Sequence, residues 1–283
     1  MNELRQQKTM KNLAILCLLI CLISSFKHKD LTWVAIGDSI TYLNDHPNET
    51  GNRVTKGYMT RVVEKLPYVH FVNQGHNGWT AVRIAQEIDK LGLTKADVYS
   101  IFLGTNDWWR GQPLGRLQDY QNSTGDGTVY GSFRIIIDKL RSLNPQARIL
   151  LITPMQRVDF VYITNFKNNA YGSYKPKAGQ QLEAFANAVD SIGRYEHVDV
   201  VDLYHMNSLG LKKLVKYKRL KDPQTGAYTN YAYPKFIDRP FNPETDEYPY
   251  PPESIDRTYD GLHPSDKGYE LISRKLVKTL KKY

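Results

Sequence analysis

The sequence is almost without cysteine. Its two cysteines, Cys17 and Cys21, both lie within the first 26 of 283 residues. The rest of the chain can therefore form no disulfide, offer no thiolate nucleophile and build no cysteine-ligated zinc site. No His-Glu-x-x-His motif occurs, and metal-ligand spacing is also missing from the other scattered histidines: His28, His46, His70, His197 and His205. We expect neither a metal nor a cofactor.

Signatures of several other protein classes are missing as well. There is no Gly-x-Ser-x-Gly, the nucleophile motif of ordinary α/β-hydrolases. Neither a Gly-x-x-x-x-Gly-Lys phosphate loop nor a Gly-x-Gly-x-x-Gly motif occurs, which argues against nucleotide chemistry. The formal net charge is +9, but no RNA- or DNA-binding motif accompanies it, so we expect no nucleic-acid partner. We interpret the clustered basic residues as solvated helix faces: Lys212, Lys213, Lys216, Lys218, Arg219 and Lys221, then Lys275, Lys278, Lys281 and Lys282.

The longest apolar run, residues 13–23, is too short to span a membrane, because a spanning helix needs about 20 residues. Lys8 and Lys11 precede this run and small residues follow it, which is the pattern of a secretory signal. We expect residues 1–26 to be a signal peptide or a retained N-terminal anchor. After cleavage, an exported protein without a membrane span would remain, in the periplasm, at the cell surface or outside the cell. About 255 residues are enough for one well-buried domain, which we place at 27–283.

Five short apolar runs are typical of strands that are buried on both faces. They cover residues 31–36, 69–73, 98–103, 147–153 and 198–203. Helical patterns alternate with them at residues 53–66, 81–91, 132–143, 178–195 and 265–280. This alternation predicts an α/β fold with a parallel five-stranded sheet, covered by helices on both sides through right-handed crossovers.

In such sheets the functional site lies outside the carboxyl ends of the strands. Ser39 follows the first predicted strand, residues 75–78 follow the second, and residues 104–107 follow the third. We therefore expect these three loops to open on the same edge of the sheet. Ser39 is the candidate nucleophile.

A nucleophilic serine needs a base, and the base needs a carboxylate that fixes its tautomer. Asp260 and His263 lie three residues apart, just before the last predicted helix. His263 would take the proton of Ser39 during attack and return it to the leaving alcohol. Three donors could stabilise the resulting oxyanion: the backbone N–H groups of Ser39 and Gly78, and the side-chain amide of Asn106.

These four segments resemble the four sequence blocks of the SGNH (GDSL-type) hydrolase superfamily. They occur in the family's order, and the resemblance spans residues 31–280 apart from the insertions. By motif match, the nucleophilic serine falls on Ser39, the oxyanion glycine on Gly78, the oxyanion asparagine on Asn106, and the Asp-x-x-His pair on Asp260 and His263. The resemblance implies a flavodoxin-like, three-layer α/β/α fold and esterase, deacetylase, lipase or thioesterase activity.

Two local points of the match stay open. Ile40 stands where the family name has leucine, which is an apolar exchange. Gly75 is also available as the glycine of the second block, although the five-residue offset of Gly78 from Asn73 fits the family better. Asp38 and Asp107 could be paired acids, but we interpret them as residues that cap and hold their loops.

Three segments fit no element of the predicted fold: residues 108–128, 156–177 and 205–258. The last is a long insertion, rich in tyrosine and proline, that leads into Asp260, and we expect it to form one wall of the substrate cleft. His76, Trp79, Trp108 and Trp109 lie in or beside the site loops and could bind substrate, although core or loop packing explains them equally well.

Export and the aromatic residues near the site favour an acylated carbohydrate as the substrate, because sugar rings stack on aromatic side chains. We expect O-deacetylation of a glycan or hydrolysis of another small ester. A lipase, lysophospholipase or thioesterase is the alternative, and it would need an apolar acyl channel beside Ser39. A glycan-binding protein on an inactive hydrolase fold is a further alternative, against which the intact set of catalytic residue types argues.

Overall fold

A computed structural model describes residues 6–7, 10 and 29–283. The signal peptide or anchor expected at residues 1–26 lies outside the described residues, apart from residues 6–7 and 10, which are helical. The chain divides into two units, Met1–Asp30 and Leu31–Tyr283. In the described part of the chain, no helix combines the length and the apolar character that crossing a membrane requires.

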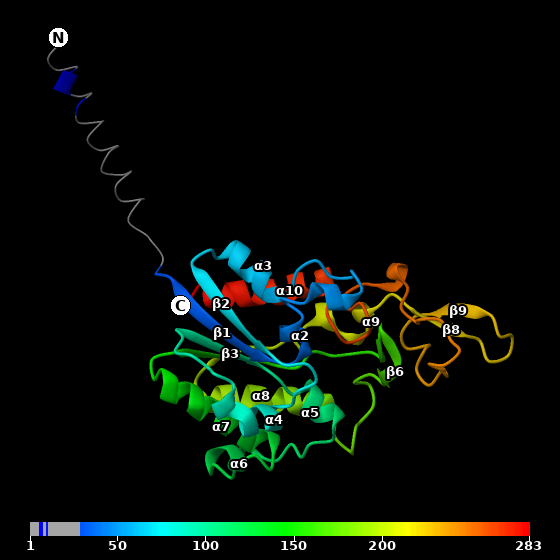
Figure 1. Ribbon diagram of the computed structural model, residues 1–283, viewed down its shortest axis with the longest axis horizontal. Helices are drawn as coiled ribbons and strands as arrows, with labels where there is room; N and C mark the ends of the chain where they lie inside the picture. Colours follow the sequence, from blue (N-terminus) through cyan, green and yellow to red (C-terminus); the bar gives the residue numbers. More distant parts are fainter. Residues whose placement is uncertain (1–5, 8–9, 11–28) are drawn as a thin grey trace. The chain divides into compact units, whose positions relative to one another are not determined.

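The second unit is built on a parallel five-stranded sheet (Figure 1). Its strands lie in the order β2-β1-β3-β4-β7, the flavodoxin-like order of a doubly wound fold. All five strands occur where the apolar runs predict them: β1 (Leu31–Gly37), β2 (Val69–Gly75), β3 (Val98–Phe102), β4 (Arg148–Ile152) and β7 (Asp199–Val201).

Alternate side chains of β1 enter two separate cores, since successive residues of a strand point to opposite faces. Trp33 and Ala35 pack into one core, and Val34 and Ile36 into the other. Figure 1 shows helices on both faces of the sheet. One core contains residues of α3 (Tyr58–Lys65) and α10 (Asp266–Leu280), and the other those of α4 (Ala81–Glu87), α7 (Val129–Leu143) and α8 (Leu182–Glu196). The predicted three-layer α/β/α fold is confirmed.

Two helices begin later than the sequence pattern predicts. The chain before α3 is held in a non-helical course because the backbone N–H groups of Thr55 and Lys56 donate to Asp266 Oδ1, at 3.0 and 3.4 Å. Before α8, Ala178 and Gly179 have φ of +47° and +75°, outside the right-handed helical region. A contact distant in sequence thus shortens α3, and left-handed backbone shortens α8.

The three segments left unassigned contain short elements. Residues 108–128 include the end of α5 (Thr105–Trp109) and α6 (Leu117–Gln121), and residues 156–177 form the hairpin of β5 (Phe160–Tyr162) and β6 (Asn165–Ala170). The long insertion contains η3 (Asn207–Leu209), α9 (Leu211–Leu214), the hairpin of β8 (Lys218–Lys221) and β9 (Tyr228–Tyr231), and η4 (Pro252–Ser254). The remaining short elements are α2 (Ser39–Tyr42), η1 (Pro47–Thr50) and η2 (Ile88–Lys90).

The insertion packs against the β5–β6 hairpin and is joined to it by hydrogen bonds and an ion pair. The hydroxyl of Tyr248 donates to the carbonyl of Val161 at 2.9 Å, and that of Tyr250 donates to the carbonyl of Asp159. Lys218 lies on β8, is only 3% exposed, and forms an ion pair with Asp159 at 2.8 Å. Our interpretation of the basic cluster as a solvated helix face is therefore wrong for Lys218, which instead joins the insertion to the hairpin. It is also wrong for Arg219 and Lys221, which lie on the same strand.

Candidate active site

The loops after β1, β2 and β3 meet at one pocket, as the sheet geometry predicts. Ser39 is the first residue of α2, directly after the Asp38 cap, whose Oδ1 accepts from the Ile40 N–H at 3.0 Å. The pocket has a volume of about 510 Å³, within the usual range for small-molecule sites. Its lining residues come from the five segments that follow β1, β2, β3, β4 and β7: Ser39, Leu43, Glu49, Asn77, Gly78, Asn106, Trp109, Arg110, Arg157, Phe160, Tyr162, Asn168, Ala170, Leu262 and His263.

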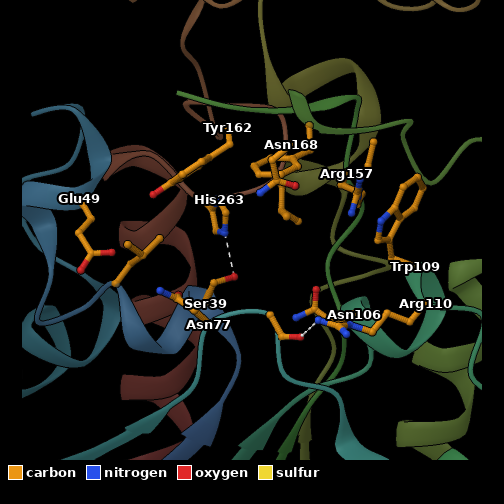
Figure 2. Close-up of a pocket in the computed structure, with 15 residues that line it drawn as sticks. Ser39, Glu49, Asn77, Asn106, Trp109, Arg110, Arg157, Tyr162, Asn168 and His263 are labelled. Carbon is orange, nitrogen blue, oxygen red and sulfur yellow. Dashed lines mark hydrogen bonds between the residues drawn. The ribbon is translucent and has the colours of Figure 1, made fainter. Parts of the chain in front are cut away.

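Ser39, His263 and Asp260 form one chain of hydrogen bonds. Figure 2 shows the contact between Ser39 and His263. His263 Nε2 lies 2.8 Å from Ser39 Oγ, and His263 Nδ1 lies 2.6 Å from Asp260 Oδ2. Asp260 is fully buried and His263 is 5% exposed. With Nδ1 protonated and bonded to the carboxylate, Nε2 is left as the acceptor for the serine hydroxyl. This arrangement can activate Ser39 for attack on a carbonyl carbon.

The turn that carries Asp260 and His263 is fixed by its own backbone. Asp260 Oδ1 accepts from the N–H groups of Leu262 and His263, at 3.0 and 2.7 Å, so both carboxylate oxygens are satisfied. Gly261 between them has φ of +91°, and a Cβ there would lie 1.9 Å from the carbonyl oxygen of Asp159. Only glycine fits this turn without displacing the neighbouring hairpin.

The β5–β6 hairpin and two rings hold the imidazole in place. The Val161 N–H donates to the Asp260 carbonyl at 3.2 Å, which links the hairpin to the turn. The ring of Phe160 meets the His263 ring edge-on at 5.5 Å, and the ring of Tyr259 stacks on it at 5.9 Å. The orientation of His263 is therefore set by packing as well as by Asp260.

The three expected oxyanion donors line the pocket together. Ser39 begins a helix, where first-turn N–H groups have no intrahelical acceptor. Gly78 has φ of +69° and lines the pocket, and in residues 29–283 its N–H has no hydrogen-bond acceptor. Gly75 ends β2 and packs against the backbone of Tyr42, where a Cβ would lie only 2.1 Å from the Tyr42 nitrogen. The geometry thus favours Gly78 over Gly75.

Asp38 and Asp107 hold loops, as predicted. Asp38 caps α2, while Asp107 lies on α5, accepts from the N–H groups of Ala81 and Val82 and so caps α4. Burial raises the pKa of each carboxyl from 3.8 to about 6, against the opposing effect of these hydrogen bonds. The charge of Asp38 adds to the rise at Asp107.

Of the four candidate substrate-binding residues, Trp109 lines the pocket. Trp108 is fully buried, and its indole N–H donates to the carbonyl of Gln180 at 2.9 Å. His76 and Trp79 stack on each other at 4.3 Å and are not among the lining residues. Core or loop packing, the alternative to substrate binding, therefore accounts for His76, Trp79 and Trp108.

The pocket wall comes from the β5–β6 segment and not from the Tyr- and Pro-rich insertion. Residues 157, 160, 162, 168 and 170 line the pocket, whereas residues 205–258 contribute none of the lining side chains. The expected role of the insertion as a cleft wall is wrong, because it packs behind the hairpin. Arg157 could have been found from the sequence, since it follows the fourth strand at the same sheet edge as Ser39.

Within residues 6–7, 10 and 29–283, no group of three or more His, Cys, Asp or Glu side chains is arranged to hold a metal ion. The polar groups of the pocket are suited to binding an ester and to stabilising negative charge on its carbonyl oxygen.

Comparison with known proteins agrees with this chemistry. The model of the GDSL-like Lipase/Acylhydrolase family matches residues 35–271. A solved structure described as a possible lipase from Chitinophaga pinensis is 65% identical, with a TM-score of 0.88, and the match covers 89% of this chain and 98% of that one. A protein from Lactobacillus plantarum is 20% identical, with a TM-score of 0.58 and coverage of 91% and 99%, and shares the fold. No curated protein matches the chain. On the strength of its matched residues and its close structural relative, the chain belongs to the GDSL-like lipase/acylhydrolase family, hydrolases that act on ester bonds.

Proposed function

We propose that the protein is an exported serine esterase that removes acetyl groups from a carbohydrate through an acyl-enzyme. The observation that carries the mechanism is the continuous hydrogen-bonded chain from Asp260 through His263 to Ser39 at the base of an open pocket. The aromatic and amide side chains around the pocket carry the choice of substrate.

In the first half of the reaction, Ser39 Oγ attacks the ester carbonyl carbon while His263 Nε2 takes the hydroxyl proton. The carbonyl oxygen becomes an oxyanion that would be held by the N–H groups of Ser39 and Gly78 and by the Asn106 amide. The tetrahedral intermediate collapses, His263 gives its proton to the leaving sugar hydroxyl, and the acyl group stays on Ser39. In the second half, water loses a proton to His263 and attacks the acyl-enzyme carbonyl. The new tetrahedral intermediate collapses, His263 returns the proton to Ser39 Oγ, and acetic acid leaves and ionises to acetate.

The pocket walls favour a sugar over a long acyl chain. Trp109 and Tyr162 bring aromatic rings to the pocket, and Asn77 and Asn168 offer amide groups for hydroxyls. Phe160, Ala170 and Leu262 form one small apolar cluster in the pocket, with Trp109 and Tyr162 packed against it, and the other lining side chains are mostly polar. An acetyl group needs only a small apolar site, whereas a long chain would leave polar groups without partners.

A lipase is the second candidate, because the 65% identical structure from Chitinophaga pinensis is described as a possible lipase. The two candidates differ in the acyl chain that they favour. A lipase should hydrolyse an octanoyl ester at least as well as an acetyl ester of the same alcohol.

The deciding experiment measures acetate release from a panel of acetylated glycans, alongside 4-nitrophenyl acetate, butyrate and octanoate. We expect acetate release from at least one glycan and a kcat/KM that falls as the chain lengthens. Equal or faster turnover of octanoate would replace the deacetylase proposal with the lipase. Ser39→Ala should lower kcat by at least about 10³-fold on every substrate, and full activity in this variant would contradict the role of Ser39 as nucleophile.

Export is part of the proposal and rests on the apolar segment at residues 13–23 with its preceding lysines. Mass spectrometry of the protein recovered from a bacterial host would show removal of about 26 residues. An intact chain in the cytoplasmic fraction would contradict export.

A further inference from the structure

The pocket contains a buried guanidinium with few partners. Arg157 is 2% exposed and has five N–H donors. Within the described residues it makes one side-chain hydrogen bond, from Nη2 to the carbonyl of Tyr171 at 3.0 Å, and its buried Nε has no acceptor. No ion pair involves Arg157 in that part of the chain. A buried charge of this kind is costly unless something compensates it.

Two acidic groups act on Arg157, and each already has a partner of its own. Asp159 pairs with Lys218 at 2.8 Å, and Asp260 bonds to His263 at 2.6 Å. Burial lowers the pKa of Arg157 to about 10 even though both carboxylates act to raise it. Within the described residues, neither carboxylate forms an ion pair with Arg157 itself.

The surroundings of Arg157 are positively charged on the pocket side. Arg157 lies 5.1 Å from the ring centre of Trp109, and Lys177 lies 4.1 Å from the same ring. Arg110 also lines the pocket, and its Nη2 donates to the carbonyl of Gly78 at 2.9 Å. Figure 2 shows Arg157, Trp109 and Arg110 together on one side of the pocket.

Among the residues that line the pocket, negative charge lies on the opposite side. Glu49 is the one acidic residue among those that line the pocket, and its carboxylate accepts from the Tyr42 hydroxyl at 2.9 Å. In Figure 2 it lies across the pocket from Arg157, beside Tyr162. A substrate bound at Ser39 therefore meets an electropositive side with unused hydrogen-bond donors.

We propose that Arg157 binds a carboxylate of the substrate, with Arg110 contributing positive charge at the rim, so that the enzyme acts on acyl esters of acidic sugars such as an O-acetylated uronic acid. This inference rests on the proposed carbohydrate esterase function and specifies its substrate class. A guanidinium matches a carboxylate because both are planar and can form two parallel hydrogen bonds. The rings of Trp108 and Trp109, whose centres lie 5.5 and 5.1 Å from the guanidinium carbon, hold the guanidinium in position for such a contact.

The test compares two substrates that differ only in charge: an O-acetylated glucuronic acid and the same sugar with its carboxylate converted to the carboxamide. We expect the wild-type enzyme to favour the charged substrate about 10- to 100-fold in kcat/KM, because charge-assisted hydrogen bonds are lost with the amide. Arg157→Gln should remove most of this preference, and Arg157→Lys should keep part of it. Arg194→Gln, on the solvent face of α8, is the matched control and should keep the full preference.

Equal turnover of the two substrates by the wild type would overturn the inference, as would an equal loss on both in Arg157→Gln, which indicates a structural role. If Arg157→Gln does not fold, the ratio of kcat/KM for the charged and the amide substrate, measured in the wild type and in Arg157→Lys, still tests the inference. Inhibition of 4-nitrophenyl acetate hydrolysis by free glucuronate, compared with glucuronamide, separates this inference from the proposed function. Stronger inhibition by glucuronate without turnover of any glycan would support the carboxylate site and contradict the carbohydrate esterase.

Discussion

At the scale of single residues, the hydrogen bonds of Asn106 show how an oxyanion could be held. Its Nδ2 donates to the carbonyl of Trp79 at 3.0 Å and contacts Asp38 Oδ2 at 3.5 Å. The first bond is of ordinary length and fixes the amide, while the second is at the limit of a hydrogen bond. The hydrogen that faces Asp38 is therefore the one that a developing oxyanion could recruit.

Asn106→Ala should lower kcat for ester hydrolysis by about 10²–10³-fold, because one oxyanion donor is lost in the transition state. KM should change little, since the ground-state carbonyl gains less from this contact. Steady-state kinetics on 4-nitrophenyl acetate would measure both constants, with the melting temperature as the check on folding. A variant that loses stability but keeps kcat would show that Asn106 only holds its loop.

Asp38 makes stability depend on pH in an unusual direction. Burial raises its pKa from 3.8 to about 6, so between these values the folded chain keeps a proton that the unfolded chain has lost. The folded state then binds more protons, and stability falls as the pH rises through this window. This rise of the pKa corresponds to a loss of folding stability on the order of 3 kcal/mol. The loss is complete above the pKa of the folded state and absent below that of the unfolded state.

Asp38→Asn should therefore be more stable than the wild type at pH 8, by about 2 kcal/mol, since asparagine caps a helix as well as aspartate and carries no buried charge. The difference should shrink as the pH falls and vanish near pH 4. Urea unfolding at pH 4 to 8 would measure it, with Asp138→Asn on the exposed face of α7 as the control. If the unfolding free energies of Asp38→Asn and the wild type change with pH in the same way, burial does not raise the pKa of Asp38.

At the scale of elements, the sheet was predictable and the hairpins were not. The inner strands β1, β3 and β4 are largely apolar because both faces of the sheet are covered there, and this composition is visible in the sequence. The β6 strand, by contrast, is mostly exposed and reads Asn-Phe-Lys-Asn-Asn-Ala, with no apolar alternation. Its strand conformation comes from pairing with β5 and from the support of the insertion behind it, which local sequence patterns do not encode.

The contact between the β5 segment and the catalytic turn can be tested at Gly261. A Cβ at this position would meet the carbonyl oxygen of Asp159 at 1.9 Å, so Gly261→Ala must displace the hairpin or the turn. We expect a loss of several kcal/mol in stability, and a fall in kcat of about 10²-fold as His263 moves away from Ser39. Thermal unfolding and steady-state kinetics would measure the two effects.

Gly125→Ala provides the matched control. Gly125 has φ of +92°, close to the +91° of Gly261, but nothing lies within 4 Å of the position of its Cβ. The control therefore carries the same backbone strain, about 1–2 kcal/mol, without the clash. If both variants lose equal stability and both stay active, the close approach at Gly261 has no role in holding the catalytic turn.

At the scale of the whole molecule, the reacting groups were predictable and the walls of the pocket were not. Ser39, Gly78 and Asn106 follow successive strands, so the rule for parallel sheets brings them to one edge. Phe160, Asn168 and the other wall residues reach the pocket through the fold of the hairpin. Lys218 illustrates the same limit, because its burial depends on Asp159, which lies 59 residues away in sequence.

The unit formed by residues 31–283 holds both cores, the sheet and every residue that lines the pocket. A chain that begins at Lys27 should therefore fold and hydrolyse 4-nitrophenyl acetate with the kcat/KM and melting temperature of the full-length protein. Active-site titration with a serine-directed phosphonate would give the concentration of active enzyme in both samples, so that the two rates can be compared per active site. A shortened chain that folds but loses more than about 10-fold in kcat/KM, equivalent to ~1.4 kcal/mol of transition-state stabilisation, would show that residues 1–26 contribute to the site. Equal rates would place the whole catalytic apparatus in the second unit, which the proposed removal of residues 1–26 on export requires.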